Sequence, residues 1–380
     1  MDKEIKLPFY VKVALTLMGI YVFLSMMYVA KTLLVPIVFA IIISIVLHPL
    51  ENYLMRFRMH RILAISITIF IAVLIVTGLG IFIILQISRF TDTLPELVAK
   101  FDQLVTEAIF WISGFFELNT QRISDWIAAT KENLLSKSGP AIGQTLLTIG
   151  NLFVVMLLIP VYIFMMLYYE PILIEFIRRS FDHGYRHKVK EVISEVKNLI
   201  QSYISGLFIE LVIVAGLNIT ALLLLGIEYA ILLGIIGALL NLIPYIGGIV
   251  AVALPMMIAL VTDTSPWMPL WVLAAYYFIQ LVDNNYIVPK IVASKVKLNA
   301  LVSIIVVLAF GALWGIPGMF ISIPVTAIIK LISDHIEPLK PFGFLLGDSM
   351  PEVNPVAGVA KRKAIKAEKT PDESPGEQSQ

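Results

Sequence analysis

The sequence predicts an all-α integral membrane protein with about seven to eight transmembrane helical elements, including two opposed broken hairpins, and two observations support this fold class. Hydrophobic residues make up 59% of the 380 residues and charged residues only 14%, and the mean hydropathy is +0.90. Apolar runs close to the ~20 residues needed to cross a bilayer recur along the chain. The chain contains no cysteine, which excludes disulfides and cysteine-based zinc or redox sites. The composition therefore favours a polytopic membrane protein over a soluble one.

The N-terminal region, residues 1–87, is predicted to contain three membrane helices. The first covers roughly 9–30 and the second roughly 33–47, close enough to form a tight hairpin, and the third covers about 62–87. Lysines precede the first apolar run, but no small-residue cleavage signal comes before Lys31. We therefore interpret this run as a retained helix rather than a signal peptide.

Residues 88–140 form a polar excursion between the third and fourth membrane helices. Apolar residues recur at helical spacing from Leu97 to Phe115, and those from Ile123 to Ile127 indicate a second, shorter helix. We expect these amphipathic helices to lie along the outer membrane surface or between subunits, without spanning the bilayer.

Residues 141–202 combine a fourth membrane helix, about 142–169, with a basic stretch that begins at Pro171. The cations of this stretch are Arg178, Arg179, Arg186, Lys188, Lys190 and Lys197. The positive-inside rule predicts that the stretch, the loop at 56–61 and the N-terminus are cytoplasmic, and that the excursion lies outside. The tail, residues 335–380, is polar and lacks apolar periodicity, so we expect it to be disordered and cytoplasmic.

The core, residues 203–334, contains two apolar stretches that each carry a break. The first reads GALLNLIPYIGGIVAVALP at 237–255, and the second reads GALWGIPGMFISIP at 311–324. Both open with Gly-Ala-Leu, reach an Ile-Pro pair followed closely by glycine, and resume an apolar run with another proline. Each break divides about thirty apolar residues into halves too short for a comfortable ~20-residue crossing. The pattern predicts two hairpins of half-helices.

The two hairpins are predicted to form a weak inverted repeat. The first follows a membrane helix at about 203–225 and is entered from outside, whereas the second follows a helix at about 266–282 and is entered from inside. Discontinuous helices in corresponding halves indicate a transporter site, and exposed half-helix N-termini favour an anionic or electron-rich solute. The alternative is that glycine and proline only allow close packing and a kink. The residues expected at the breaks are Pro244, Gly247, Gly248, Gly311, Gly315, Pro317, Gly318 and Pro324.

Polar side chains near the hairpins supply the candidate transport residues. Glu210 lies within a predicted membrane helix, where a carboxylate must face protein or water. At that depth its pKa could rise enough for it to carry a proton. The alternative is that it lies near enough to the cytoplasmic face for water to solvate it. Asn218 lies two turns further on and shares its face. Asp283, Asn284 and Asn285 end the next helix, where their oxygen atoms suit sodium or a polar solute, or simply cap the helix.

Other motifs give no support to catalysis. His183 and His187 have i, i+4 spacing, but nothing else completes a coordination set, so we interpret them as solvated or lipid-facing. The sequence contains no Walker loop, nucleophile elbow or metalloprotease helix. We therefore predict no enzyme activity, no metal site and no cofactor beyond a coupling ion, sodium or proton.

Three segments carry a family resemblance: NLIPYIGGIVAVALP, IQLVDNNYIVPKIV and GALWGIPGMFISIPVTAIIKLI. They resemble the signature segments of the autoinducer-2 exporter family of bacterial membrane proteins, and the likeness extends over about Phe9 to Ile332. It implies a multi-pass transporter of the bacterial inner membrane that forms homo-oligomers. Autoinducer-2 export is proposed for some members of this family and sodium/proton antiport for others.

The resemblance also assigns individual positions. The family's first break falls on Asn241, Pro244, Gly247 and Gly248. Its polar helix end falls on Gln280, Asp283, Asn285 and Pro289. Its second break falls on Gly311, Gly315, Pro317, Gly318 and Pro324. The chain departs from the pattern at Asp283, where similar chains usually carry glutamate, and at Asn299, where proline is common.

Together these features predict a transporter that moves a small polar or anionic solute or signal molecule where the two hairpins meet. The candidates for charge or proton coupling are Glu210 and Asp283, and those for polar contacts are Asn218, Asn241, Asn284 and Asn285. The expected partners are the lipid bilayer, the solute and further copies of the chain, not nucleic acid. A sodium/proton antiporter and a non-transporting membrane scaffold or receptor are the alternatives. Bulk at Gly318 is expected to affect transport more than folding, because small residues let the backbone approach a solute.

Overall fold

The computed structural model describes residues 8–116, 138–243, 247–262, 265, 267–293 and 296–349. In these ranges the chain is almost entirely helical, and its β-type pairing is limited to one isolated bridge between Leu298 and Gly347. Six helices in these ranges are long and apolar enough to cross a membrane: Phe9–Val29, Lys31–Met55, Arg61–Ser88, Leu158–Arg179, His183–Leu224 and Ala300–His335. The predicted all-α membrane fold is confirmed.

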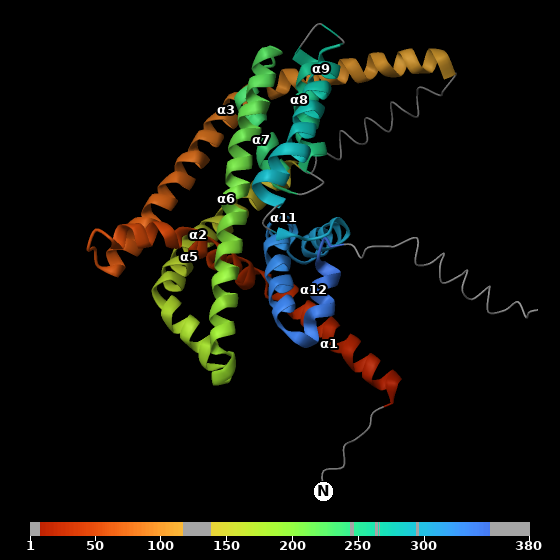
Figure 1. The fold of residues 1–380 in the computed structure, drawn as a ribbon. Coiled ribbons are helices and arrows are strands. Elements are labelled where there is room, and N and C mark those ends of the chain that lie inside the picture. Colours follow the sequence, from red (N-terminus) through yellow and green to blue (C-terminus); the bar gives the residue numbers. More distant parts are fainter. Residues whose placement is uncertain are drawn as a thin grey trace, which may run out of the picture.

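The first two helices do not form the expected tight hairpin. α1 (Phe9–Val29) and α2 (Lys31–Met55) follow one another across the molecule, α1 in red and α2 in the adjoining orange-red (Figure 1). Only Ala30 separates them, and its N–H donates to the Met26 carbonyl at 2.9 Å while its carbonyl accepts from the Leu34 N–H at 2.9 Å. The backbone hydrogen bonding is therefore nearly continuous, which leaves too few free residues for the chain to reverse.

α3 (Arg61–Phe116) combines the third predicted membrane helix with the first helix of the excursion. The two were expected as separate elements, but the helix runs through the polar residues between them and extends well beyond the core (Figure 1). Helical hydrogen bonding needs no apolar face to continue, so the change from an all-apolar to an amphipathic pattern does not end a helix. The second excursion helix, predicted at 123–127, lies outside the described residues.

The predicted basic stretch is the turn of a long helical hairpin. α5 (Ser138–Arg179) ends within it, the short 3-10 helix η1 (His183–Tyr185) makes the turn, and α6 (Arg186–Leu224) leads back through the molecule. In Figure 1 this hairpin projects downward, and α6 then runs alongside α7 and α8. The membrane helix predicted at 203–225 is therefore only the second half of α6.

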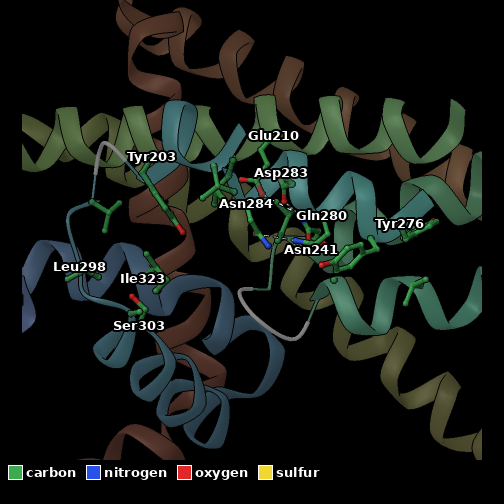
Figure 2. Close-up of a pocket in the computed structure, with 18 of the residues that line it drawn as sticks. Tyr203, Glu210, Asn241, Tyr276, Gln280, Asp283, Asn284, Leu298, Ser303 and Ile323 are labelled. Atoms are coloured by element: carbon green, nitrogen blue, oxygen red, sulfur yellow. Dashed lines mark hydrogen bonds between the residues drawn. The ribbon is translucent and has the colours of Figure 1, made fainter. Parts of the chain in front are cut away.

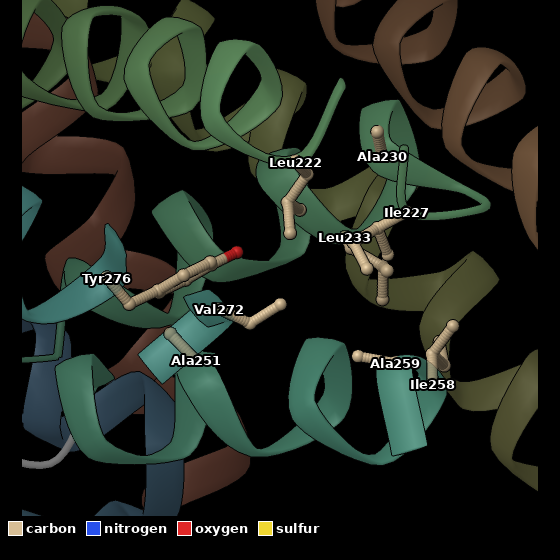
Figure 3. Packing of buried hydrophobic residues seen from close by; sticks show 9 residues of the cluster. All are labelled: Leu222, Ile227, Ala230, Leu233, Ala251, Ile258, Ala259, Val272 and Tyr276. Carbon is tan, nitrogen blue, oxygen red and sulfur yellow. The ribbon is translucent and has the colours of Figure 1, made fainter. Parts of the chain in front are cut away.

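The first broken stretch folds as predicted into two short helices, α7 (Ala230–Asn241) and α8 (Gly247–Thr262). They pack closely at the turn, because a β-carbon at Gly247 would lie 1.9 Å from the Leu240 carbonyl oxygen. Pro244 lies outside the described residues. The hairpin packs against α6 and α9 (Met268–Val282) through the buried cluster in Figure 3, which comprises Leu222, Ile227, Ala230, Leu233, Ala251, Ile258, Ala259, Val272 and Tyr276.

The second broken stretch lies inside α11 (Ala300–His335). Gly315 has φ 68° and ψ −150°, a conformation that glycine adopts readily and that interrupts the helix. The two halves fold back on each other, since a β-carbon at Gly318 would lie 2.1 Å from the Phe310 carbonyl oxygen. The tip is fixed to α1 by Trp314, whose indole N–H donates to the Met27 carbonyl at 3.1 Å.

The C-terminal segment is ordered further than predicted. The 3-10 helix η3 (Glu337–Leu339) and α12 (Lys340–Leu346) follow α11 within the region expected to be disordered, whose remainder, 350–380, lies outside the described residues. Asn299 holds the end of α12: its N–H donates to the Leu346 carbonyl at 3.1 Å, and its Nδ2 donates to the carbonyls of Leu345 at 2.7 Å and Gly347 at 3.0 Å.

Candidate functional site

A cavity of about 830 Å³ lies between α6, the turn of the first hairpin, α9 and the π-helical segment η2 (Asp283–Ala293). Ala300 and Ser303 at the start of α11 (Ala300–His335) also line it. Figure 2 shows its polar side chains converging from these elements. The polar residues that line it are Tyr203, Glu210, Asn241, Tyr276, Tyr277, Gln280, Asp283, Asn284, Lys297 and Ser303.

Two carboxylates and one amide form the centre of this cavity. Asn241 Nδ2 donates to Asp283 Oδ2 at 2.8 Å and approaches Glu210 Oε1 at 3.5 Å, so one amide group bridges two acids. Glu210 and Asp283 are only 5% and 2% exposed. Asp283 Oδ1 is buried and has no hydrogen-bond partner within the described residues. An unpartnered buried carboxylate oxygen is costly, so the site has the capacity to accept a proton, a cation or a hydrogen-bond donor.

Each of these three side chains lies at a point where a helix is interrupted or closely packed. Asn241 is the last residue of α7, directly before the hairpin turn, and Asp283 is the first residue of the π-helical segment. π-Helical turns are rare and occur often at functional sites. Glu210 lies within α6, one turn from Gly206, where a β-carbon would lie 2.7 Å from the Ile291 carbonyl oxygen. This close packing of α6 on η2 places Glu210 beside Asp283.

Gly248 leaves room for polar side chains on the side of the cavity formed by the first hairpin. A β-carbon at Gly248 would lie 2.5 Å from Gln280 Oε1, so the glycine allows this amide to lie against the start of α8. Gln280 Nε2 in turn donates to Asn284 Oδ1 at 3.3 Å. Asn285 lies elsewhere: it is exposed, its Nδ2 donates to the Leu281 carbonyl at 2.8 Å, and it does not line the cavity.

Asn218 extends the polar side of α6 beyond the cavity. It is 2% exposed, and its Oδ1 has no hydrogen-bond partner within the described residues. The hydroxyl of Tyr276 is also buried without a partner there. Both side chains approach Gly237, where a β-carbon would lie 3.2 Å from Asn218 Nδ2 and 3.4 Å from the Tyr276 hydroxyl. Two unsatisfied polar groups therefore lie next to the cavity wall, on the same side of α6 as Glu210.

The described residues of the two hairpins contribute different parts to the cavity wall. The turn of the first hairpin lines the cavity through Asn241, Leu242 and Gly248. The second hairpin contributes only residues of its flanks, Ala300, Ser303 and Ile323. The other residues predicted at the breaks and described by the structure do not line the cavity; these are Gly247, Gly311, Gly315, Pro317, Gly318 and Pro324.

Comparison with known proteins decides the class of the chain. A family model described as AI-2E family transporter matches residues 13–337. The chain belongs to the AI-2E transporter family. The family and the apolar helices together imply a multi-pass protein of the bacterial inner membrane.

Two relatives of this AI-2E transporter match it over most of its length. It is 27% identical over 327 residues to the AI-2 transport protein TqsA of Escherichia coli (strain K12), which covers 84% of this chain and 90% of TqsA. It is 24% identical over 350 residues to a Bacillus subtilis (strain 168) protein named "Putative transport protein YrrI", which covers 88% of this chain and 98% of that protein. Membrane transport is thus the function that the family and its named members share.

The chain also contains a partly buried ionic network that the sequence analysis did not identify. Glu170 of α5 accepts a hydrogen bond from Lys197 of α6 and pairs with His48 of α2 at 3.1 Å. Beside them Glu51, 1% exposed, pairs with Arg61 at 3.6 Å. His48, Glu51 and Glu170 are residue types that bind metals, but the two adjacent cations already balance the two carboxylates. The network therefore joins α2, α3, α5 and α6. The only feature of the sequence that could have indicated it is the presence of charged residues inside apolar runs.

The two histidines with i, i+4 spacing do not belong to this network. His183 and His187 are both exposed, in and just after the turn between α5 and α6. They are positioned as surface residues of the basic turn, not as part of either the cavity or the ionic network.

Proposed function

We propose that this AI-2E transporter moves a small polar solute across the inner membrane through the cavity, and that Glu210 and Asp283 couple the movement to an ion gradient. The observation that carries the proposal is the acid pair bridged by Asn241, with one carboxylate oxygen left unpartnered. Buried charges inside a membrane protein are costly and are typical of substrate and proton pathways. The irregular backbone beside them supports the same interpretation, because it is tolerated at membrane depth where it lines a cavity.

The lining indicates the chemistry of the solute. Hydroxyl and amide groups from α6, α9, η2 and α11 surround two carboxylates, whereas Lys297, the cation among the described lining residues, is exposed. Such a wall pairs best with a neutral solute rich in hydroxyl groups, which can donate to the carboxylates and accept from the amides. We therefore favour a neutral polar solute over an anionic one. Autoinducer-2 is the first candidate, because one relative is named an AI-2 transport protein.

A sodium/proton antiporter is the second candidate. Asp283 Oδ1 is unpartnered, and the side-chain oxygen atoms of Glu210, Gln280 and Asn284 belong to the same cavity. Carboxylate and carbonyl oxygens are the ligands that hard cations prefer. Two nearby carboxylates in a poorly hydrated site also resist ionising together, which would let a proton and a cation compete for them.

Flux measurements in proteoliposomes separate these candidates. We would compare autoinducer-2, sodium and proton movement for the wild type, Asp283→Asn and Glu210→Gln, with Asn285→Ala as the control because that side chain lies outside the cavity. Both acid variants should lose gradient-driven movement while Asn285→Ala keeps it. Sodium–proton exchange without solute movement would favour the antiporter. If no species moves in the wild type, or if all three variants behave alike, the proposal fails and a non-transporting scaffold becomes the better interpretation.

A further inference from the structure

A second cavity, of about 950 Å³, lies between the α5–α6 hairpin and the far end of α11. Its walls are almost entirely aliphatic and aromatic side chains from α2, α5, α6 and α11, among them Ile174, Phe176, Val189, Ile193, Ile332 and Ile336. We call this cavity the hairpin groove. It shares no lining residue with the transport cavity.

The inner end of the hairpin groove carries charges that already balance one another. Its charged lining residues there are His48, Glu170 and Lys197, which belong to the ionic network. Glu170 binds both other side chains, so neither a cation nor an anion is needed to complete this end. A polar ligand would therefore find few unpaired groups to bind at this inner end.

The outer end of the hairpin groove is different, because it carries a lysine without a direct partner. Lys188 lines it and has neither a hydrogen bond nor an ion pair within the described residues. The nearby Glu337 is bound by Lys340 at 2.6 Å, and Lys340, with a smaller contribution from Lys188, holds the pKa of Glu337 below its ordinary value. The Glu337 carboxylate is thus already paired with Lys340.

We propose that the hairpin groove holds an acyl chain of an anionic phospholipid, whose phosphate is bound by Lys188. The apolar walls match a hydrocarbon chain, and the Lys188 ammonium at one end matches a single negative head group. Basic pockets between helices on the cytoplasmic side are known to bind anionic lipid head groups. The groove follows α5 from Met166 to Ile177, about 17 Å at 1.5 Å per residue, which suits an extended chain.

Other occupants fit less well. A peptide would bring backbone N–H and C=O groups into a groove whose inner walls offer them few partners. The chain's own residues 350–380 are mostly polar and charged, and such a segment fits an aliphatic groove poorly. The proposal is independent of the transported solute, since the two cavities are separate.

Lipid binding can be measured on the purified full-length chain by native mass spectrometry and by thermal stabilisation. We would compare phosphatidylglycerol with phosphatidylcholine for the wild type, Lys188→Glu, and Lys190→Glu as the matched control. Both lysines are exposed near the start of α6, but only Lys188 lines the groove. We expect the wild type and Lys190→Glu to retain phosphatidylglycerol preferentially, and Lys188→Glu to lose at least about fivefold in that preference. Equal retention of the two lipids by the wild type, or equal losses in the two variants, would overturn the proposal.

Val189→Trp tests the apolar part, because it fills the groove and leaves Lys188 in place. It should abolish lipid retention while the protein stays monodisperse; unchanged retention would show that lipid binds elsewhere. A chain truncated after Ser349 should bind phosphatidylglycerol as the full chain does. A large gain of binding on truncation would mean that residues 350–380 occupy the groove, which contradicts the proposal.

Discussion

Gly206 of α6 packs so closely on η2 that a β-carbon there would lie 2.7 Å from the carbonyl oxygen of Ile291. This contact fixes the distance between the helix that carries Glu210 and the segment that begins with Asp283. Gly206→Val should therefore separate the two acids and cost about 1–3 kcal/mol of stability through overpacking. We expect gradient-driven flux to fall about tenfold or more, because the bridge through Asn241 requires both carboxylates in place.

Gly216→Val is the matched control for this substitution. Gly216 is on the same helix, and a β-carbon there meets nothing within 4 Å. Flux and thermal midpoint should both stay near the wild-type values. If the two valine variants lose flux equally, the effect comes from changing α6 in general, and the contact between Gly206 and Ile291 does not set the geometry of the site.

The hairpin breaks could be predicted from the sequence because their causes are local. Gly315 supplies a positive φ, and Gly247 allows two chain segments to touch, so glycine and proline spacing alone identified both turns. Glu210, Asn241 and Asp283 were also identified individually, since polar residues in apolar runs are conspicuous. Their close contact was not predictable, because it depends on helix packing at Gly206.

Where the prediction failed, the deciding contacts are between segments far apart in the sequence. The tip of the second hairpin was expected to lie beside the transport pathway, but Trp314 at this tip donates to the Met27 carbonyl of α1 instead. Similarly, the pairing of Glu170 with Lys197 and His48 joins three helices. Periodicity and composition describe one segment at a time, so they carry no information about such partners.

The ionic network should contribute to stability. Glu170→Gln removes the carboxylate between His48 and Lys197 and leaves a partly buried ammonium group without its counter-ion. We expect a loss of about 1–3 kcal/mol. Thermal denaturation of the purified protein in detergent measures it. Glu175→Gln is the control, because its pairs with Arg178 and Arg179 are at the surface and should change the midpoint little. Equal shifts in both variants would contradict a special role for the network.

Asn299 should hold the C-terminal segment in place. Its side chain both caps α11, by accepting from the Val302 N–H at 2.8 Å, and donates to the carbonyls of Leu345 and Gly347. Asn299→Asp keeps an acceptor for the cap but removes the two donors. We therefore expect faster hydrogen exchange at 340–347 in this variant, with little change at the start of α11. Unchanged exchange at 340–347 would show that other contacts hold α12.

The orientation in the membrane is open to a direct test, because the chain contains no cysteine. We propose that the α5–α6 turn and both termini are cytoplasmic, since basic residues gather at this turn. A single cysteine in place of Lys188 should resist a membrane-impermeant thiol reagent in intact cells, whereas one in place of Asn119 should react. The reverse pattern would invert the topology. Labelling of both after cell disruption shows that each site is accessible.

Gly318→Leu distinguishes a packing role from a transport role at the second hairpin. The sequence alone predicted that bulk here would obstruct a solute, but Gly318 is buried outside the cavity, and its β-carbon would lie 2.1 Å from the Phe310 carbonyl oxygen. We now expect the variant to yield much less monodisperse protein, with normal flux per folded molecule. Gly248→Ala is the counterpart: its β-carbon meets only the flexible Gln280 side chain, so the protein should fold and lose flux. If Gly318→Leu folds normally and loses flux, the pathway reaches the second tip.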